Sequence, residues 1–203
     1  VKISSDQKNH ASFVQTAIRA LFKETGYSLH ETDAIAVTAG PGSYTGLRVG
    51  IATAKGLCYA LQKPLIFINT LEVMALASIE EYKAKLLFTG EMKISEMLFC
   101  PMIDARRMEV FTALYSVTLQ TISEPTAVIL DENSFKENLG SNSILFSGSG
   151  SSKLKNIISH PGAFFSNVQQ HAGHLSVLSI KAFGQKKFAD IATSGPTYIK
   201  EFF

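Results

Sequence analysis

The chain has 203 residues, of which 46% are hydrophobic and 18% are charged, and its formal net charge is +2. This composition is typical of one or two packed units, so it excludes an extensively disordered protein, and the small net charge does not favour a polyanion-binding protein. The apolar runs are too short to cross a bilayer, and Cys58 and Cys100 lie in apolar stretches typical of buried thiols, so we expect a cytoplasmic protein.

Strands and helices alternate in the first part of the chain. Apolar residues at helical spacing predict a helix over residues 9–25, with Asn9 as its N-cap and Gly26 as its stop. The strands and helices predicted after it lie at residues 34–37, 47–61, 65–68 and 71–82. Such alternation indicates a parallel α/β lobe. Residues 1–5 look like the end of a strand, so we expect this lobe to lack its opening strands in this chain.

The second part of the chain begins after residues 83–96, a stretch of mixed charge that we interpret as a linker. Two apolar runs joined at residues 104–108 predict a β-hairpin. The other strands, helices and extended pieces are predicted at residues 128–130, 133–139, 143–146, 173–183 and 196–199. We therefore predict two α/β lobes, over residues 1–82 and 97–203.

A glycine-rich loop joins the first predicted strand to the helix that follows it. Backbone N–H groups and the positive end of a helix suit an anion, but the loop lacks the Gly-Lys-Ser/Thr ending of a P-loop and the spacing of a dinucleotide-binding turn. It is either an anion loop or simply a tight turn. The candidate anion or nucleotide residues, including one carboxylate from the hairpin turn, are Gly40, Gly42, Ser43, Thr45, Gly46 and Asp104.

Small residues recur every four positions along the helix after this loop. Such a stripe allows another helix to approach closely, either within the chain or from another subunit. We predict an interface that combines the stripe with apolar residues of the first helix. Its residues are Phe13, Ile18, Leu21, Phe22, Gly46, Gly50, Ala54 and Cys58.

Two further groups of polar residues have more than one interpretation. His171 and His174 are spaced for a shared ligand, but no cysteine or carboxylate accompanies them locally, so we expect surface histidines. Two basic pairs are either solvated surface or contacts to RNA phosphates. These pairs are Arg106-Arg107 and Lys186-Lys187.

The run over residues 34–57, which contains Thr38-Ala39-Gly40-Pro41-Gly42-Ser43-Tyr44-Thr45-Gly46-Leu47-Arg48, resembles the signature of the TsaB (YeaZ) family. Further matches follow in the family's order at residues 9–10, 71–72, 103–110 and 196–200. The resemblance implies an α/β fold of the actin, Hsp70 and sugar-kinase (ASKHA) type, with two ribonuclease-H-like lobes. The family also carries an older label as a glycoprotease of the M22 type, for which the sequence offers no chemistry.

The resemblance implies a non-catalytic scaffold for a TsaD-type transferase, which makes threonylcarbamoyladenosine at adenosine 37 of tRNA. That transferase binds a metal through a His-x-x-x-His pair, and the matching positions here are Thr70 and Met74, so we expect no catalytic residue, metal site or intrinsic cofactor. The implied partners are the TsaD-type paralogue, a TsaE-type ATPase, a second copy bound through the first-lobe helices, and tRNA indirectly, with ATP or ADP at a partner interface. The alternatives are a kinase or transferase of the same fold and a free-standing nucleotide-binding module.

Overall fold

The computed structural model describes residues 1–3, 10–89 and 97–200 of the chain. These residues form two compact units. The first unit comprises Val1–Thr70 and His171–Thr197, and the second comprises Leu71–Gln170 and Tyr198–Phe203. The division differs from the predicted lobes at residues 1–82 and 97–203, because the chain returns to the first unit near its end.

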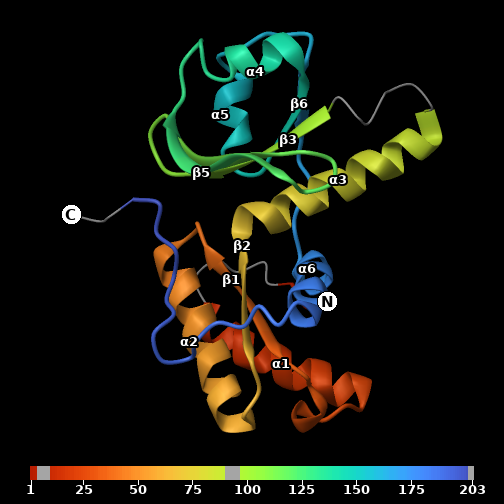
Figure 1. Ribbon diagram of the computed structural model, residues 1–203, viewed down its shortest axis with the longest axis vertical. Coiled ribbons are helices and arrows are strands. Elements are labelled where there is room, and N and C mark those ends of the chain that lie inside the picture. The colour runs from red at the N-terminus through yellow and green to blue at the C-terminus, as the bar shows by residue number, and fades with distance from the viewer. Residues whose placement is uncertain (4–9, 90–96, 201–203) are drawn as a thin grey trace. The chain divides into compact units, whose positions relative to one another are not determined.

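The first unit is built around a two-stranded parallel sheet. Its elements are α1 (His10–Thr25), the 3₁₀-helix η1 (Leu29–Glu31), β1 (Ile35–Gly40), α2 (Tyr44–Leu61), β2 (Leu65–Asn69) and α6 (Ala172–Gly184). β1 and β2 pair in parallel, with Ile35 opposite Leu65, which confirms the predicted pattern. Because side chains alternate along a strand, Val37 packs on the α2 side, whereas Ala36 lies on the α6 side. Figure 1 shows α2 and α6 on opposite sides of the two strands.

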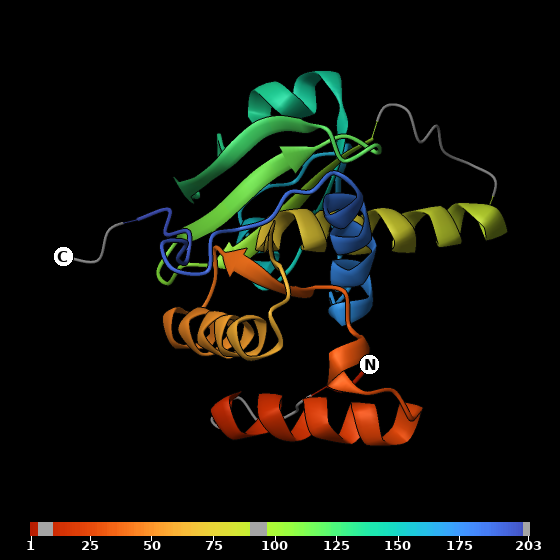
Figure 2. The ribbon, with the colours of Figure 1, turned by 60° about the horizontal axis from the view of Figure 1, so that its bottom comes forward.

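The helix boundaries of the first unit follow local signals. α1 ends before Gly26, whose φ of 75° is left-handed and whose N–H donates to the Phe22 carbonyl at 3.0 Å, so the predicted stop is confirmed. The predicted cap Asn9 lies outside the described residues. α2 begins at Tyr44, three residues before the predicted start, because the Ser43 side chain caps it. Figure 2 shows α1 running along the outside of the unit, next to α2.

The second unit contains a five-stranded mixed sheet. Its elements are α3 (Thr70–Thr89), β3 (Met97–Asp104), β4 (Glu109–Tyr115), β5 (Thr121–Ile129), α4 (Lys136–Ser141), β6 (Ser143–Ser147), α5 (Ser151–Lys155) and β7 (Ala163–Ser166). The strand order is β5-β4-β3-β6-β7, with the β3–β4–β5 meander antiparallel and β6 and β7 parallel to β3. The predicted hairpin is confirmed, whereas α5 and β7 were not predicted.

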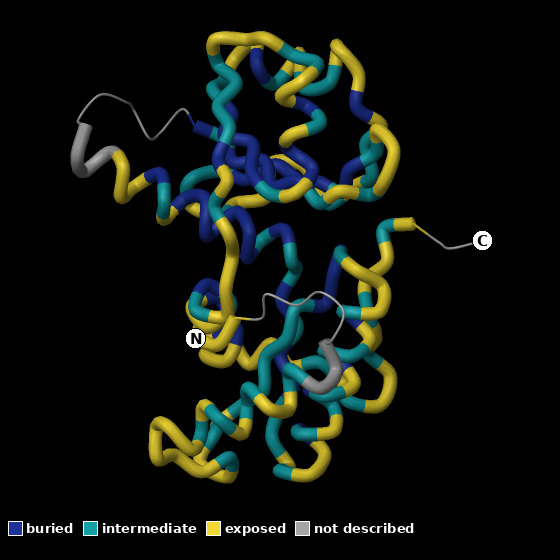
Figure 3. The backbone as a smooth tube through the Cα atoms, turned by 180° about the vertical axis from the view of Figure 1, so that it is seen from behind, coloured by how far each residue is buried: buried dark blue, intermediate teal, exposed yellow. Residues whose placement is uncertain are grey.

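The mixed sheet is covered on both faces. On one face, Phe99 packs against Ile79 and Tyr82 of α3; on the other, Phe146 belongs to a cluster with residues of α4 and α5. That second cluster consists of Cys100, Met102, Val110, Leu114, Leu130, Leu139, Ile144, Phe146 and Leu154. Figure 3 shows buried residues concentrated along these strands and the adjacent part of α3. The second unit therefore has a conventional three-layer core.

Several predicted boundaries were wrong. Residues 83–89 continue α3 and are not a linker, whereas residues 90–96 lie outside the described part of the chain. Residues 1–3 form no strand, and residues 196–199 are not a strand either, although the Thr197 N–H donates to the Ala39 carbonyl at 2.7 Å. Within the described ranges, the helices lack the combination of length and apolar composition needed to cross a membrane.

The buried thiol of Cys100 makes the stability of the second unit sensitive to high pH. The Thr112 hydroxyl donates to the Pro101 carbonyl at 2.8 Å, so the thiol donates to Thr112 at 3.1 Å. Burial raises the pKa of Cys100 from 9.0 to about 12, because the charged thiolate is poorly solvated there. The unfolded chain therefore loses this proton first, and the associated stability is present below pH 9 and is lost as the pH rises toward 12.

We expect the free energy of unfolding of the wild type to fall between pH 8 and pH 10 by about 1.4 kcal/mol more than that of Cys100→Ala. Urea unfolding of both proteins at the two pH values measures this difference, and effects of lysines, tyrosines and Cys58 cancel. An equal pH dependence in the two proteins would contradict burial of the Cys100 thiol.

Candidate functional site

The predicted anion loop forms the turn between β1 and α2. Ser43 is the N-cap of α2, and its hydroxyl accepts a hydrogen bond from the Gly46 N–H at 3.4 Å. One of the amides at the helix start is therefore already satisfied by the chain itself. Thr45 is exposed at the same helix end, and Gly42 packs against Leu47. The structure thus gathers these five loop candidates, Gly40 included, in one turn.

Gly40 lies in close contact with a neighbouring backbone segment. Its φ is 119°, and a Cβ placed on it would lie 2.5 Å from the Thr197 carbonyl oxygen. A side chain is excluded there both by the backbone conformation and by the neighbouring segment. The glycine is therefore explained by a close backbone approach, which is the structural alternative that the sequence left open.

Asp104 lies in the second unit, at the end of β3, and its hydrogen-bond partners belong to the same unit. Its Oδ1 accepts from the Lys153 Nζ at 2.7 Å and from the Arg106 N–H at 2.6 Å. The hydrogen bond from Lys153 holds the pKa of the Asp104 carboxyl below its usual value, and the Arg106 N–H acts in the same direction. The carboxylate is thus engaged in holding the hairpin turn, which agrees with the structural role of a turn-forming aspartate.

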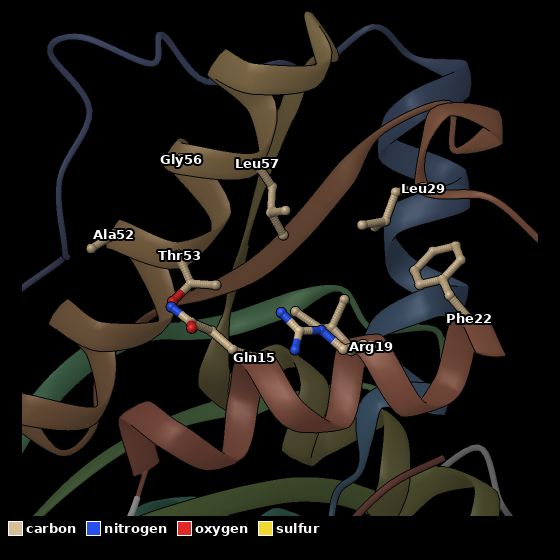
Figure 4. A pocket seen from close by; sticks show the side chains of 9 residues that line it. Gln15, Arg19, Phe22, Leu29, Ala52, Thr53, Gly56 and Leu57 are labelled. Carbon is tan, nitrogen blue, oxygen red and sulfur yellow. The ribbon is translucent and has the colours of Figure 1, made fainter. Parts of the chain in front are cut away.

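A groove of about 620 Å³ lies between α1 and α2 on the outer side of the first unit. In Figure 4, Gln15 of α1 and Thr53 of α2 point toward one another across it. Its lining residues are Gln15, Ile18, Arg19, Phe22, Leu29, Ala52, Thr53, Gly56 and Leu57. Two residues of the predicted interface, Ile18 and Phe22, therefore line this groove, and Leu21 is exposed on the same helix. Phe13 is half-buried.

The small-residue stripe faces inward, which corrects its predicted place in an interface. Ala54 and Cys58 are buried against Leu65 of the chain's own sheet, and a Cβ on Gly50 would lie 3.5 Å from the Val37 side chain. Gly46 sits at the helix start over Ser43. The stripe lets α2 approach β1 and β2 closely, so its role is packing within the first unit.

Sequence reasoning missed the small residues on the outer face of α2. Ala52 and Gly56 are exposed there, and nothing lies within 4 Å of the position of a Cβ on Gly56. A signal for this orientation existed, because the buried residues of α2 follow a helical apolar pattern. These residues are Leu47, Ile51, Ala54 and Cys58. The pattern places the stripe and the pair Ala52 and Gly56 on opposite faces and favours the stripe for the core, and burial in the structure decides it.

The start of α3 contains Thr70 and Met74, the two positions that match the metal-binding His-x-x-x-His pair of the TsaD-type transferase. Thr70 begins the helix, and Met74 is 5% exposed and packs among Leu71, Ala75, Ala113 and Tyr115. Among the described residues, no three histidine, cysteine, aspartate or glutamate side chains are grouped as they would need to be to hold a metal ion. The side chain of Met74 thus contributes to the core of the second unit.

His171 and His174 have a structural role at the start of α6. The His171 Nδ1 accepts from the Gly173 N–H, and the His174 Nδ1 accepts from the His171 N–H, both at 3.1 Å. The rings stack with their centroids 3.8 Å apart. His174 is only 7% exposed, so the expectation of surface histidines was wrong for this residue. Together the two side chains cap the helix that returns to the first unit.

The fold defines the class of protein. The meander of three strands followed by two parallel strands, with helices on both faces, is the ribonuclease-H-like arrangement of actin-like proteins. Two solved structures share the fold. A crystal structure of a protein with similarity to peptidase YeaZ from Pseudomonas aeruginosa has a TM-score of 0.79 at 23% identity, covering 97% of this chain and 87% of that one. A structure titled YeaZ from the same organism has a TM-score of 0.75 at 24% identity, covering 94% and 84%.

Sequence comparisons identify the family. The model described as TsaD, tRNA N6-adenosine threonylcarbamoyltransferase, matches residues 4–201, and the chain belongs to this family. The tRNA threonylcarbamoyladenosine biosynthesis protein TsaB of Bacillus subtilis (strain 168) is 28% identical over 202 residues, which are 96% of this chain and 81% of that protein. TsaB of Haemophilus influenzae is 27% identical over 66% of this chain and 60% of its own length. The predicted resemblance to TsaB is thus confirmed.

The transferases match over a shorter stretch. The tRNA N6-adenosine threonylcarbamoyltransferase of Zymomonas mobilis is 48% identical to this chain, but over 67 residues, which are 33% of this chain and 18% of the transferase. The similarity to TsaB proteins therefore extends along much more of the chain, whereas the similarity to transferases is stronger but local.

Proposed function

We propose that this chain is a non-catalytic partner of a TsaD-type transferase in the synthesis of threonylcarbamoyladenosine in tRNA. The observation that carries the proposal is the nearly full-length match to TsaB of Bacillus subtilis, over 96% of this chain, against a match to the transferase over 33%. The buried thioether of Met74 supports it, because a side chain committed to the core of the second unit offers no ligand to a catalytic metal.

The partner surface is the outer groove between α1 and α2. Ile18 and Phe22 supply apolar surface from α1, and Ala52 and Gly56 leave room on α2 for the helix of a partner. A helix pair from the paralogue, or from a second copy, placed on this groove would form a four-helix bundle. A TsaE-type ATPase and nucleotide would join the assembly through the paralogue. The proposed role is therefore to support the transferase without performing the chemistry.

We expect the isolated chain to bind no stoichiometric metal and to make no threonylcarbamoyladenosine on unmodified tRNA. Adding the TsaD-type paralogue and the ATPase should yield the modification, and the chain should co-purify with the paralogue. Metal analysis of the purified chain and a tRNA modification assay with each component omitted in turn measure these outcomes. Modification by the chain without the paralogue would reject the scaffold and favour an independent enzyme of the same fold.

A further inference from the structure

The turn between β3 and β4 presents two arginines in an unusual backbone conformation. Arg106 has a φ of 71° and Arg107 a φ of 46°, both in the left-handed region that side-chain-bearing residues rarely adopt. Both residues are exposed. Left-handed turn positions usually hold glycine or asparagine, so the backbone conformation alone does not explain two consecutive arginines here.

The backbone of this turn is held from several sides. Besides the bond from the Arg106 N–H, the Asp104 carboxylate accepts from the Lys153 Nζ, and the Asp104 N–H donates to the Ser149 hydroxyl at 3.1 Å. The Glu109 N–H closes the turn by donating to the Arg106 carbonyl at 3.0 Å. The turn is thus anchored to the loop after β6 and to α5, and the two arginine side chains project from a fixed base.

The acids next to the turn are already paired with lysines. Lys153 lies 2.7 Å from the Asp104 carboxylate, and Lys200 lies 2.7 Å from the Glu109 carboxylate. In the part of the chain that the structure describes, neither the Arg106 nor the Arg107 guanidinium makes a hydrogen bond or an ion pair. Two consecutive residues at the tip therefore carry positive charges without an acidic partner among the residues described, in a chain whose formal net charge is only +2.

We infer that the Arg106–Arg107 tip binds phosphates of the RNA backbone. A guanidinium is planar and presents paired N–H donors that match two phosphate oxygens, and its charge persists at any physiological pH. Neighbouring guanidiniums on a fixed turn suit consecutive phosphates, with no base readout. The choice of RNA as the source of phosphates rests on the proposed function. This contact makes tRNA binding in part a direct property of this chain.

The second basic pair provides a matched control. Lys186 and Lys187 are also exposed and adjacent, and Lys186 also has a left-handed φ, of 53°. Their position has another explanation, because the Lys187 N–H donates to the Ala182 carbonyl at 3.0 Å, and cations are favourable at the C-terminal end of a helix such as α6. Changing this pair alters the net charge equally without changing the hairpin tip.

The test is a fluorescence anisotropy titration of the full chain with an unmodified anticodon stem-loop RNA at several salt concentrations. R106Q/R107Q should weaken binding about tenfold and lower the slope of log affinity against log salt by about 1.4 to 1.8, since two phosphate contacts are lost. R106K/R107K should keep most of the salt dependence while losing part of the RNA affinity. Lysine retains the positive charge but lacks the paired N–H donors of a guanidinium. K186Q/K187Q should bind like the wild type. Circular dichroism establishes that each variant is folded.

Each remaining outcome has a definite meaning. Unchanged RNA affinity of R106Q/R107Q, or an equal loss in K186Q/K187Q, overturns the inference. If R106Q/R107Q keeps its RNA affinity but no longer co-purifies with the paralogue, the tip contacts an acidic protein surface, and the inference is again overturned. If the wild-type chain does not bind the paralogue while the RNA results are as expected, the proposed function fails and the RNA contact stands.

Discussion

Gly56→Leu should weaken binding of the TsaD-type paralogue about tenfold to a hundredfold while leaving the chain folded. Gly56 lies on the outer face of α2, lines the groove shared with α1, and has nothing within 4 Å of its Cβ position. A leucine there fills the space that a partner helix would occupy, and overpacking of a helix contact costs about 1–3 kcal/mol. The same change should stabilise the isolated chain by about 0.5–1 kcal/mol, because leucine favours a helix interior more than glycine does.

Affinity is measured by titrating the paralogue in sedimentation experiments, and stability by urea unfolding. Gly140→Leu is the matched control, because Gly140 is an exposed helical glycine of α4 in the second unit with nothing within 4 Å of its Cβ position. Gly50→Leu should instead destabilise the first unit, since its side chain would grow toward Val37. Undiminished association of Gly56→Leu would place the interface elsewhere on the molecule.

Gly148→Val is expected to have the largest effect on stability, a loss of about 3–5 kcal/mol in the free energy of unfolding of the second unit. Gly148 has a φ of 86°, and a Cβ on it would lie 2.3 Å from the Met74 Cε and 2.5 Å from the Met102 carbonyl oxygen. The methionine side chain can move, but the backbone carbonyl belongs to β3 in the middle of the sheet. A β-branched residue in a left-handed conformation adds to the penalty.

Thermal unfolding followed by circular dichroism measures this effect, and the midpoint should fall by about 10 °C or more. Gly140→Val serves as the control for introducing valine at an uncrowded glycine. In a Met74→Ala background the Gly148→Val penalty should persist, because the conflict with the Met102 carbonyl remains. A wild-type midpoint for Gly148→Val would mean that the loop after β6 does not pack as the structure has it.

Local patterns in the sequence were enough to predict a large part of the fold. Apolar periodicity and the stop at Gly26 predicted α1, and the apolar runs before the glycine turn and after Pro64 predicted β1 and β2. Two apolar runs likewise predicted the hairpin around residues 104–108. These elements are decided by residues close together in the chain, so propensity and capping act in the same direction as the packing.

Other features depended on contacts between residues far apart in the sequence. β7 has only four residues, too few to show a strand periodicity in the sequence, and its pairing with β6 stabilises it as a strand. α6 was predicted as a helix, but its membership of the first unit depends on packing against β1 and β2 and on the Ala189 N–H that donates to the Leu65 carbonyl at 2.8 Å. The change in composition near residue 83 could not show that the chain returns to the first unit at His171.

The sequence by itself determined the family, the α/β character of both units and the residues of the glycine turn, since these are carried by a continuous run of side chains. Only the tertiary structure decided which side of α2 is free. The small residues Gly50, Ala54 and Cys58 taken alone fit a partner helix or the chain's own sheet, and burial against Val37 and Leu65 selected the sheet. A periodicity fixes which residues share a face, whereas the neighbours present in space fix what that face contacts.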